Sequence, residues 1–194
     1  MARFEIVARA LDGIVVLRPT VFRDERGFFL ESFNAREFAE LSLPTDFVQD
    51  NMSWSRRGVL RGLHFQWDRP MGKLLRVCTG RIQLVEVDIR PDSPHCGRHW
   101  SAVLSADDHA IVWIPPGFAN GFLVLSTEAI VQYKCTAFYN PHGEGAIRWN
   151  DPALDISWQS DTEPIVSDKD RHAMTLQQWL ERPESHTFSY HNTL

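Results

Sequence analysis

Short runs of β-branched and aromatic residues, separated by Gly, Pro, Asp and Ser turns, dominate this chain and constrain its fold most strongly. Their length and spacing are typical of an all-β sandwich or barrel. Within the longest run, Thr79-Gly80 is the expected tip of a hairpin. We therefore predict an antiparallel structure closed into a small barrel or jelly roll. The runs cover residues 14–19, 27–33, 59–66, 73–90, 110–116, 121–126 and 129–139.

Helix signals occur at only two places. In NAREFAELS (34–42), Asn34 is a predicted N-cap, and Glu37 follows three residues later as in a capping box. A second helical pattern surrounds TLQQWLER (175–182). Both helices are predicted to be short and to lie at the periphery of the fold.

The chain organisation indicates one unit. No repeat, low-complexity tract or Pro/Ser-rich linker interrupts the sequence, so residues 1–194 are predicted to form a single domain. A chain of this length buries about 70% of its surface on folding, which is enough for a substantial core. We expect the last residues, about 183–194, to form a loosely held tail.

Composition restricts the partners and the compartment. The net charge of −5 and the lack of a large basic patch argue against a nucleic-acid or anionic-membrane surface. Charges interrupt the N-terminal segment MARFEIVARALDGIVVLRP, and no later stretch approaches the roughly 18 apolar residues of a membrane helix, so we expect a cytoplasmic protein. Three cysteines without CxxC spacing indicate neither a disulfide framework nor a zinc site.

The stretch VLRGLHFQ (59–66) holds His64, the only one of eight histidines with a large apolar residue on each side. One interpretation is a core histidine satisfied by a backbone carbonyl, because buried polar groups need a partner. The other is a catalytic group. Strict alternation would put Arg61 and His64 on opposite faces of a strand. They converge only if Gly62 bends or bulges the strand.

A metal site is the first chemical reading to test. Metal-binding jelly rolls draw histidines and a carboxylate from two strand pairs, approximately as HxH and as PxG followed by His. Here the first position reads His64-Phe65-Gln66, and PPGFAN (115–120) contains no histidine. We therefore expect no metal.

Metal-free acid–base chemistry needs a base that titrates near neutral pH, an acid on the other side of the substrate, and cations for developing negative charge. An aspartate that orients the imidazole favours its protonated form. Each candidate also has an ordinary structural reading as a core aromatic, a solvated strand residue or a turn residue. The candidates are His64 as base, Tyr133 as acid, Lys73 and Arg61 as charge stabilisers, and Asp170 as the orienting group.

About ten motifs, in order over more than 150 residues, carry a resemblance to a known family. They are PTVFRDERGFFLESFN, FVQDN, GVLRGLHFQ, GKLLRV, VDIR, SPHCG, WIPPGFANGF, YKCT, FYNPHGEGAIRWNDPAL and SDKDR. On these motifs the sequence resembles the dTDP-4-dehydrorhamnose 3,5-epimerase family. The resemblance implies a cupin-like jelly roll, a homodimer, and no metal or organic cofactor.

The implied reaction is epimerisation of a nucleotide-linked 4-keto-6-deoxyhexose. The C4 ketone acidifies the protons at C3 and C5, so a base forms an enolate and reprotonation on the other face inverts the carbon. By motif, His64 is the implied base, Asp170 its charge partner and Tyr133 the acid, with Lys73 and Arg61 beside the enolate oxygen. The implied contacts to the nucleotide sugar are Arg26, Phe29, Glu31, Gln49, Asn51, Asn120, Tyr139, Glu144 and Lys169.

Three positions depart from the usual family pattern. Asn120 stands where members usually have His, Leu84 where they usually have Asp, and Met52 where many have His. An amide can hydrogen-bond a sugar oxygen but cannot exchange a proton at neutral pH. We therefore hypothesise a variant nucleotide sugar or inversion at C3 only. A ketoisomerase, a non-catalytic sugar-nucleotide-binding protein and an interaction-only jelly roll are the rival readings.

Overall fold

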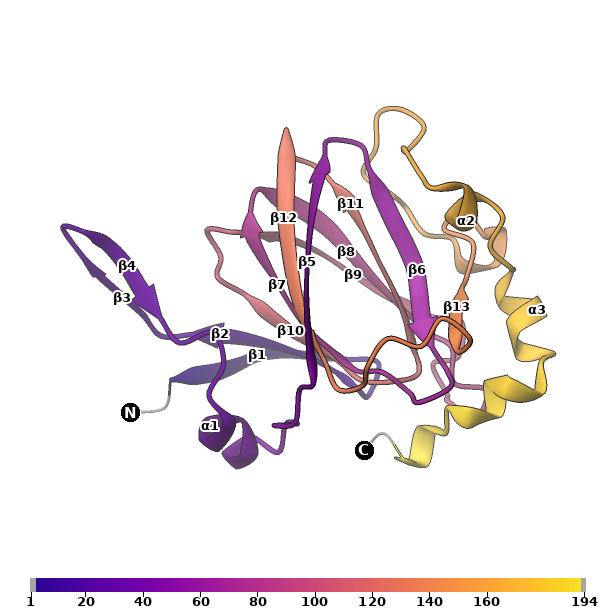
Figure 1. Cartoon of the computed structure of the whole chain (residues 1–194). Coiled ribbons are helices and arrows are strands. Elements are labelled where there is room, and N and C mark those ends of the chain that lie inside the picture. The colour runs from indigo at the N-terminus through magenta and orange to yellow at the C-terminus, as the bar shows by residue number, and fades with distance from the viewer. Residues whose placement is uncertain (1–2, 193–194) are drawn as a thin grey trace.

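A six-stranded antiparallel sheet forms one layer of the computed structural model, which describes residues 3–192 (Figure 1). Its strands follow the order β1-β2-β10-β7-β12-β5, so segments from both halves of the chain are neighbours. The bounds are β1 Phe4–Ala10, β2 Ile14–Pro19, β5 Gln49–Arg56, β7 Lys73–Thr79, β10 Ile111–Ile114 and β12 Glu128–Cys135.

A five-stranded antiparallel sheet forms the second layer and faces the first (Figure 1). Its order is β13-β6-β11-β8-β9. The non-sequential orders of the two sheets are those of a jelly-roll sandwich. The bounds are β6 Leu60–Gln66, β8 Arg81–Asp88, β9 His99–Ser105, β11 Phe118–Val124 and β13 Glu144–Ala146.

The main apolar core lies between the two sheets. Leu75 and Val131 from the first sheet belong to the same buried cluster as Leu84 and Phe122 from the second. Leu84 is fully buried there. Because side chains alternate along a strand, Glu86 and Asp88 share this inner face with Leu84. The predicted polar side of β8 therefore faces the protein interior.

Helical segments cover the outer faces of both sheets. Helix α1 (Ala35–Glu40) places Phe38 in a cluster on the first sheet. Asn34 caps α1 as predicted, but the Glu37 carboxylate accepts a hydrogen bond from the backbone N–H of Arg3. On the second sheet, Trp179 of α3 (Leu176–Leu180) is fully buried. The remaining helical segments are α2 (Asp168–Arg171), η1 (Pro152–Leu154), η2 (Pro183–Thr187) and η3 (Tyr190–Asn192). None of the helices within residues 3–192 is long and apolar enough to cross a membrane.

The expectation of a loose tail over residues 183–194 is wrong for the described part of that range. Phe188 is 4% exposed and its ring lies 6.0 Å from that of Trp179. The Tyr190 hydroxyl donates a hydrogen bond to Asp12, and its backbone N–H donates to Asp92. One buried aromatic ring and these anchors hold the segment, whereas residues 193–194 lie outside the described range.

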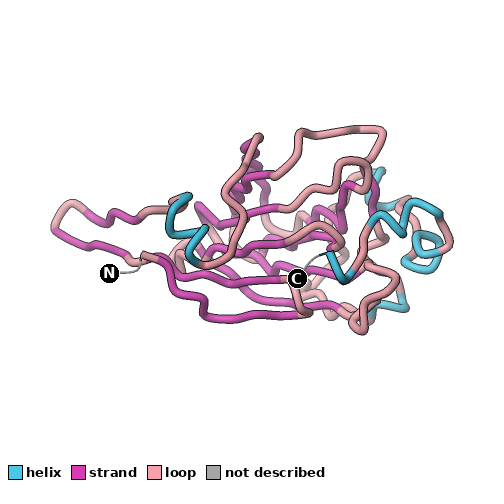
Figure 2. Tube along the Cα trace, turned by 90° about the horizontal axis from the view of Figure 1, so that it is seen from below, coloured by secondary structure: helices cyan, strands magenta, loops and turns pink. Residues whose placement is uncertain are grey.

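A tight turn and a hairpin lie at the edges of the sandwich. Gly80 leads from β7 to β8 at φ +78°, and an added Cβ would lie 2.1 Å from the Glu128 carbonyl oxygen. The hairpin predicted at Thr79-Gly80 is wrong, because β7 and β8 belong to different sheets and each pairs with other strands. The β3–β4 hairpin (Val21–Asp24 and Gly27–Leu30) instead projects beyond both sheets (Figures 1 and 2). Its Phe29 is 63% exposed. The projecting hairpin is thus an apolar arm with little cover from its own chain.

Candidate active site

A bulge at Gly62 brings Arg61 and His64 to one face of β6, as the prediction required. Across the β6–β11 pairing, His64 is opposite Asn120 and Arg61 is opposite Phe122, so β6 holds one extra residue. Gly62 has φ +128°, and an added Cβ would lie 2.5 Å from the Cα of Gly121. Paired residues share a face, and therefore Arg61 and His64 both point toward the space between the sheets.

The partner of His64 is a carboxylate and not the backbone carbonyl of the alternative reading. His64 Nε2 lies 2.6 Å from Asp170 Oδ1, and the Asp170 side chain is 4% exposed. Ser167 caps α2 and fixes Asp170 at the third position of that turn. Asp170 also accepts a hydrogen bond from the Gly62 N–H.

The environment of Asp170 favours its ionised form. Burial alone would raise the pKa of Asp170, but the hydrogen bond and charge of His64, together with the Gly62 N–H, outweigh burial and lower that pKa. An ionised carboxylate only accepts hydrogen bonds, so Nε2 of His64 carries the proton. Nδ1 then keeps a free lone pair, and a base needs such a lone pair to accept a proton.

Tyr133 and Lys73 stand on the opposite sheet. Tyr133 of β12 pairs with Asn51 of β5, and Lys73 of β7 pairs with Cys135 of β12. These residues share the inner face, and Lys73 Nζ lies 5.6 Å from the centre of the Tyr133 ring. Burial raises the pKa of Tyr133, which keeps its hydroxyl protonated at neutral pH. The site therefore has a possible acid facing a possible base.

Lys73 continues into a buried polar chain that crosses between the sheets. Its Nζ donates to Asn120 Oδ1 at 3.2 Å, and Asn120 Nδ2 donates to Glu86 Oε1 at 2.5 Å. Burial lowers the pKa of Lys73 and raises that of Glu86 well above its usual value. Sequence reasoning placed Asn120 and Lys73 in the site but missed Glu86. Its position two residues after Leu84 on a polar strand face was the available signal.

Arg61 lies at the mouth of the site. Its Nε donates a hydrogen bond to Ser55 Oγ at 2.9 Å, which ties β6 to β5 on the facing sheet. Arg61 is an exposed residue. A cation in this place can approach a bound anion without being removed from water.

Five predicted substrate contacts form one hydrogen-bonded network. Gln49 donates to Asn51 at 3.0 Å and accepts from the backbone N–H of Tyr139 at 2.9 Å. The Tyr139 hydroxyl donates to Glu144 at 2.8 Å, and Lys169 forms an ion pair with the same carboxylate. Burial alone would raise the pKa of Glu144, but the hydrogen bonds from Lys169 and Tyr139 outweigh it and lower the pKa.

Three other predicted contacts are not part of this network within the chain. Arg26 pairs with Asp24 at the turn of the projecting hairpin, and Phe29 is exposed on the same hairpin. Glu31 forms an ion pair with Arg3 at 2.9 Å. The arm that carries Arg26 and Phe29, labelled β3 and β4, projects away from β6 in Figure 1.

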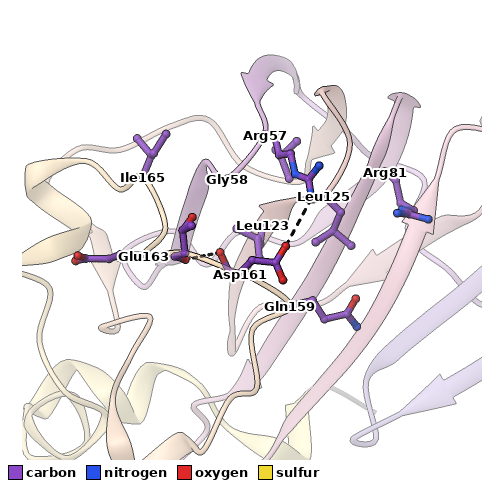
Figure 3. A pocket seen from close by; sticks show the side chains of 12 residues that line it. Arg57, Gly58, Arg81, Leu123, Leu125, Gln159, Asp161, Glu163 and Ile165 are labelled. Carbon is purple, nitrogen blue, oxygen red and sulfur yellow. Dashed lines mark hydrogen bonds and ion pairs between the residues drawn. The ribbon is translucent and has the colours of Figure 1, made fainter.

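A separate cavity of about 520 Å³ lies where β8 and β11 meet the loop of residues 159–165. Arg57 and Asp161 form an ion pair across it at 3.8 Å (Figure 3). None of the predicted site residues lines this cavity. Within residues 3–192, no group of three or more His, Cys, Asp or Glu side chains is placed to hold a metal ion.

Comparisons with known proteins agree with the sequence resemblance. A family model described as dTDP-4-dehydrorhamnose 3,5-epimerase matches residues 8–178. A dTDP-4-dehydrorhamnose 3,5-epimerase from Methanothermobacter thermautotrophicus is 46% identical over 180 residues, which are 92% of this chain and 97% of that protein.

Solved structures show the same fold. A dTDP-6-deoxy-D-glucose-3,5-epimerase from Legionella pneumophila, in complex with dTDP-4-keto-L-rhamnose, is similar with a TM-score of 0.89 and 43% identity, over 94% of this chain and 96% of that chain. A 3′-monoepimerase from Streptomyces bikiniensis, in complex with dTDP-quinovose, has a TM-score of 0.81 and 32% identity, over 85% and 84% of the two chains. The predicted cupin-like jelly roll is confirmed.

Proposed function

The chain belongs to the dTDP-4-dehydrorhamnose 3,5-epimerase family, and from this premise we propose that it inverts C3 and C5 of a dTDP-linked 4-keto-6-deoxyhexose with His64 as base and Tyr133 as acid. The observation that carries the proposal is the placement of His64, backed by Asp170, on one sheet and of Tyr133 on the facing sheet. A ring held between the sheets meets the two groups on opposite faces.

The first step breaks a C–H bond next to the ketone. Nδ1 of His64 takes the proton from C3 or C5, and the electron pair of that bond moves into the enolate. Asp170 stabilises the imidazolium that forms. Lys73 and Arg61 stabilise the negative charge that develops on the C4 oxygen.

The second step forms a new C–H bond on the opposite face. The Tyr133 hydroxyl donates its proton to the carbon, the enolate collapses to the ketone, and the configuration is inverted. The resulting phenolate regains a proton through solvent while the imidazolium loses one. The raised pKa of Tyr133, caused by burial, makes its hydroxyl the stable form between turnovers.

The network around Gln49 and Asn51 is proposed to hold the nucleotide. The Tyr139 ring is 54% exposed and can stack on a pyrimidine, while Lys169 supplies a cation for the diphosphate. The two solved structures described above hold dTDP-linked sugars. A dTDP-linked substrate is therefore the first one to test.

Incubation with dTDP-4-keto-6-deoxyglucose in D₂O tests the reaction. We expect two deuterium atoms per sugar, at C3 and C5, and no deuterium with the His64→Ala variant. Mass spectrometry counts the deuterium and NMR locates it. Folded wild-type protein that incorporates none would contradict the proposal.

Inversion at C3 only is the second candidate. The observation that favours it is the pair of departures at Leu84 and Asn120. Asn120 is hydrogen-bonded to Lys73, and Leu84 lies in the core on the same inner face. The similar monoepimerase shows that this fold supports such a reaction. Deuterium at C3 without deuterium at C5 is the result this candidate predicts.

A homodimer explains the position of the projecting hairpin. Arg26 and Phe29 lie on this arm, outside the network of their own chain. In a two-fold dimer, an arm can reach the site of the partner while the partner's arm reaches back. The exposed Phe22, Phe28 and Phe29 supply apolar area for such a contact.

Mixed dimers test this arrangement. Arg26→Ala and His64→Ala subunits are each expected to lose activity, and their mixture should regain about a quarter of the wild-type rate, because half of the dimers then hold one intact site. Size-exclusion chromatography with light scattering measures the assembly. Recovery no greater than the sum of the two parents would show that each arm serves its own chain.

A further inference from the structure

Glu86 is a fully buried carboxylate with few donors around it. It lies on the inner face of β8, opposite Asn120 of β11. Oε1 accepts the Asn120 amide, whereas Oε2 makes no hydrogen bond within the described residues. A buried polar atom without a partner costs about 1–3 kcal/mol. Stability alone therefore does not explain an acid in this place.

The hydrogen-bonding capacities of its neighbours allow only one arrangement. A Lys73 ammonium only donates, and an ionised Glu86 only accepts. The amide between them must turn Oδ1 to Lys73 and Nδ2 to Glu86, as it does here. If position 86 carried an amide, its own NH₂ group could face Asn120, and only Lys73 would then favour this orientation.

We propose that Glu86 is a positioning residue that acts through Asn120 on Lys73. It favours the observed orientation of the Asn120 amide, which holds Nζ of Lys73 in the pocket, and once ionised its negative charge favours the ammonium form. The inference rests on the proposed function only for the role of Lys73 in catalysis.

Other charged groups around Lys73 do not replace Glu86. Cys135 and Glu144 also favour its ammonium form, but Glu86 contributes more than either, and burial opposes all three by lowering the pKa of Lys73. Glu144 is already paired with Lys169. Removing the charge of Glu86 should therefore leave the Lys73 ammonium less favoured.

Lysine NMR measures this effect without substrate. The chain contains only Lys73, Lys134 and Lys169, so biosynthetic [ε-¹³C]lysine gives three signals, which Lys-to-Arg variants assign. We expect Glu86→Gln to shift the Lys73 titration midpoint to lower pH. Gln83→Leu is the matched control, because Gln83 is a buried polar residue on the outer face of the same strand, bonded to Ser101 and Ser157.

Steady-state kinetics are the second test of the positioning role. Glu86→Gln should lower kcat about 10²-fold with little change in KM, because a misplaced Lys73 affects the enolate more than the bound ketone. Asn120→Ala should cause the same loss, and the double variant no more than either single one. Asn120→Ala also keeps the test open if Glu86→Gln does not fold.

The outcomes separate the two proposals. A downward shift of Lys73 in Glu86→Gln and Asn120→Ala, absent in Gln83→Leu, supports the positioning role. An unchanged Lys73 titration in folded Glu86→Gln overturns it. If Lys73 responds while the wild-type protein incorporates no deuterium into the sugar, the positioning stands and the proposed function fails.

Discussion

Asp170 beside His64 and Glu86 beside Asn120 are both buried carboxylates, yet their surroundings act on them in opposite directions. Asp170 receives hydrogen bonds from a histidine and a backbone N–H, and its pKa is lowered despite burial. Glu86 receives one bond, from a neutral amide, and burial raises its pKa. Burial thus dominates at Glu86, which has a single neutral donor, whereas at Asp170 the charged and backbone donors outweigh burial.

Removal of His64, the partner of Asp170, should cause the largest loss of activity. His64→Ala is expected to lower kcat/KM by up to about 10⁴-fold, because general base catalysis contributes about 10²–10⁴-fold. The Lys73 titration should not change, since His64 is not part of the Lys73–Asn120–Glu86 chain. Steady-state kinetics and lysine NMR on one preparation give both values. A loss below tenfold would show that His64 is not the base.

A third carboxylate on β8 tests the importance of donors. Leu84→Asp places a charge among the apolar side chains of the core, and should lower the free energy of unfolding by about 3–5 kcal/mol. Leu84→Met should cost less than about 1.5 kcal/mol. Urea denaturation measures both variants. Equal costs would mean that the core at Leu84 accepts a charge as readily as a methionine.

Asp170→Asn should remove a pH-dependent part of the stability. A lowered folded pKa means that ionised Asp170 stabilises the protein above its unfolded pKa, near 3.8, and that this contribution is lost as the pH falls through the folded value. Wild type should therefore exceed Asp170→Asn in stability at pH 7, and the difference should shrink progressively as the pH falls below about 3.8. A difference that stays constant between pH 3 and pH 7 would contradict the assignment.

Glu86→Gln should show the opposite trend. Because the folded pKa of Glu86 is raised, the folded state binds its proton more tightly, and wild-type stability falls as the pH rises above the unfolded pKa, near 4.5. The stability of Glu86→Gln relative to wild type should increase from pH 4.5 upward. Thermal unfolding across this range measures the trend, and a decrease instead would mean that Glu86 is stabilised as a carboxylate.

Local patterns predicted most of the strands and the bulge that brings Arg61 and His64 together. Alternation and turn residues predicted the strands, and the conflict between Arg61 and His64 predicted the bulge at Gly62, because both are properties of neighbouring residues. The same alternation placed Leu84 and Glu86 on one face. It could not tell that this face is closed off between two sheets, since that depends on strands distant in sequence.

The errors have the same physical origin. Residues 183–192 have a polar sequence typical of a loop. Phe188 nevertheless packs against Phe65, which is distant in the sequence, and against Trp179 of the preceding helix. At Gly80 the chain passes from one sheet to the other and does not form the predicted hairpin. Both errors concern long-range packing that no local pattern contains.

Tyr133→Phe in D₂O tests most directly the claim that base and acid act from opposite faces. Without the hydroxyl, His64 should still remove the C3 proton and return deuterium to the same face. We expect deuterium at C3 in sugar of unchanged configuration, with formation of the epimer strongly reduced, both read by NMR. Epimer formed by Tyr133→Phe at the wild-type rate would contradict the account.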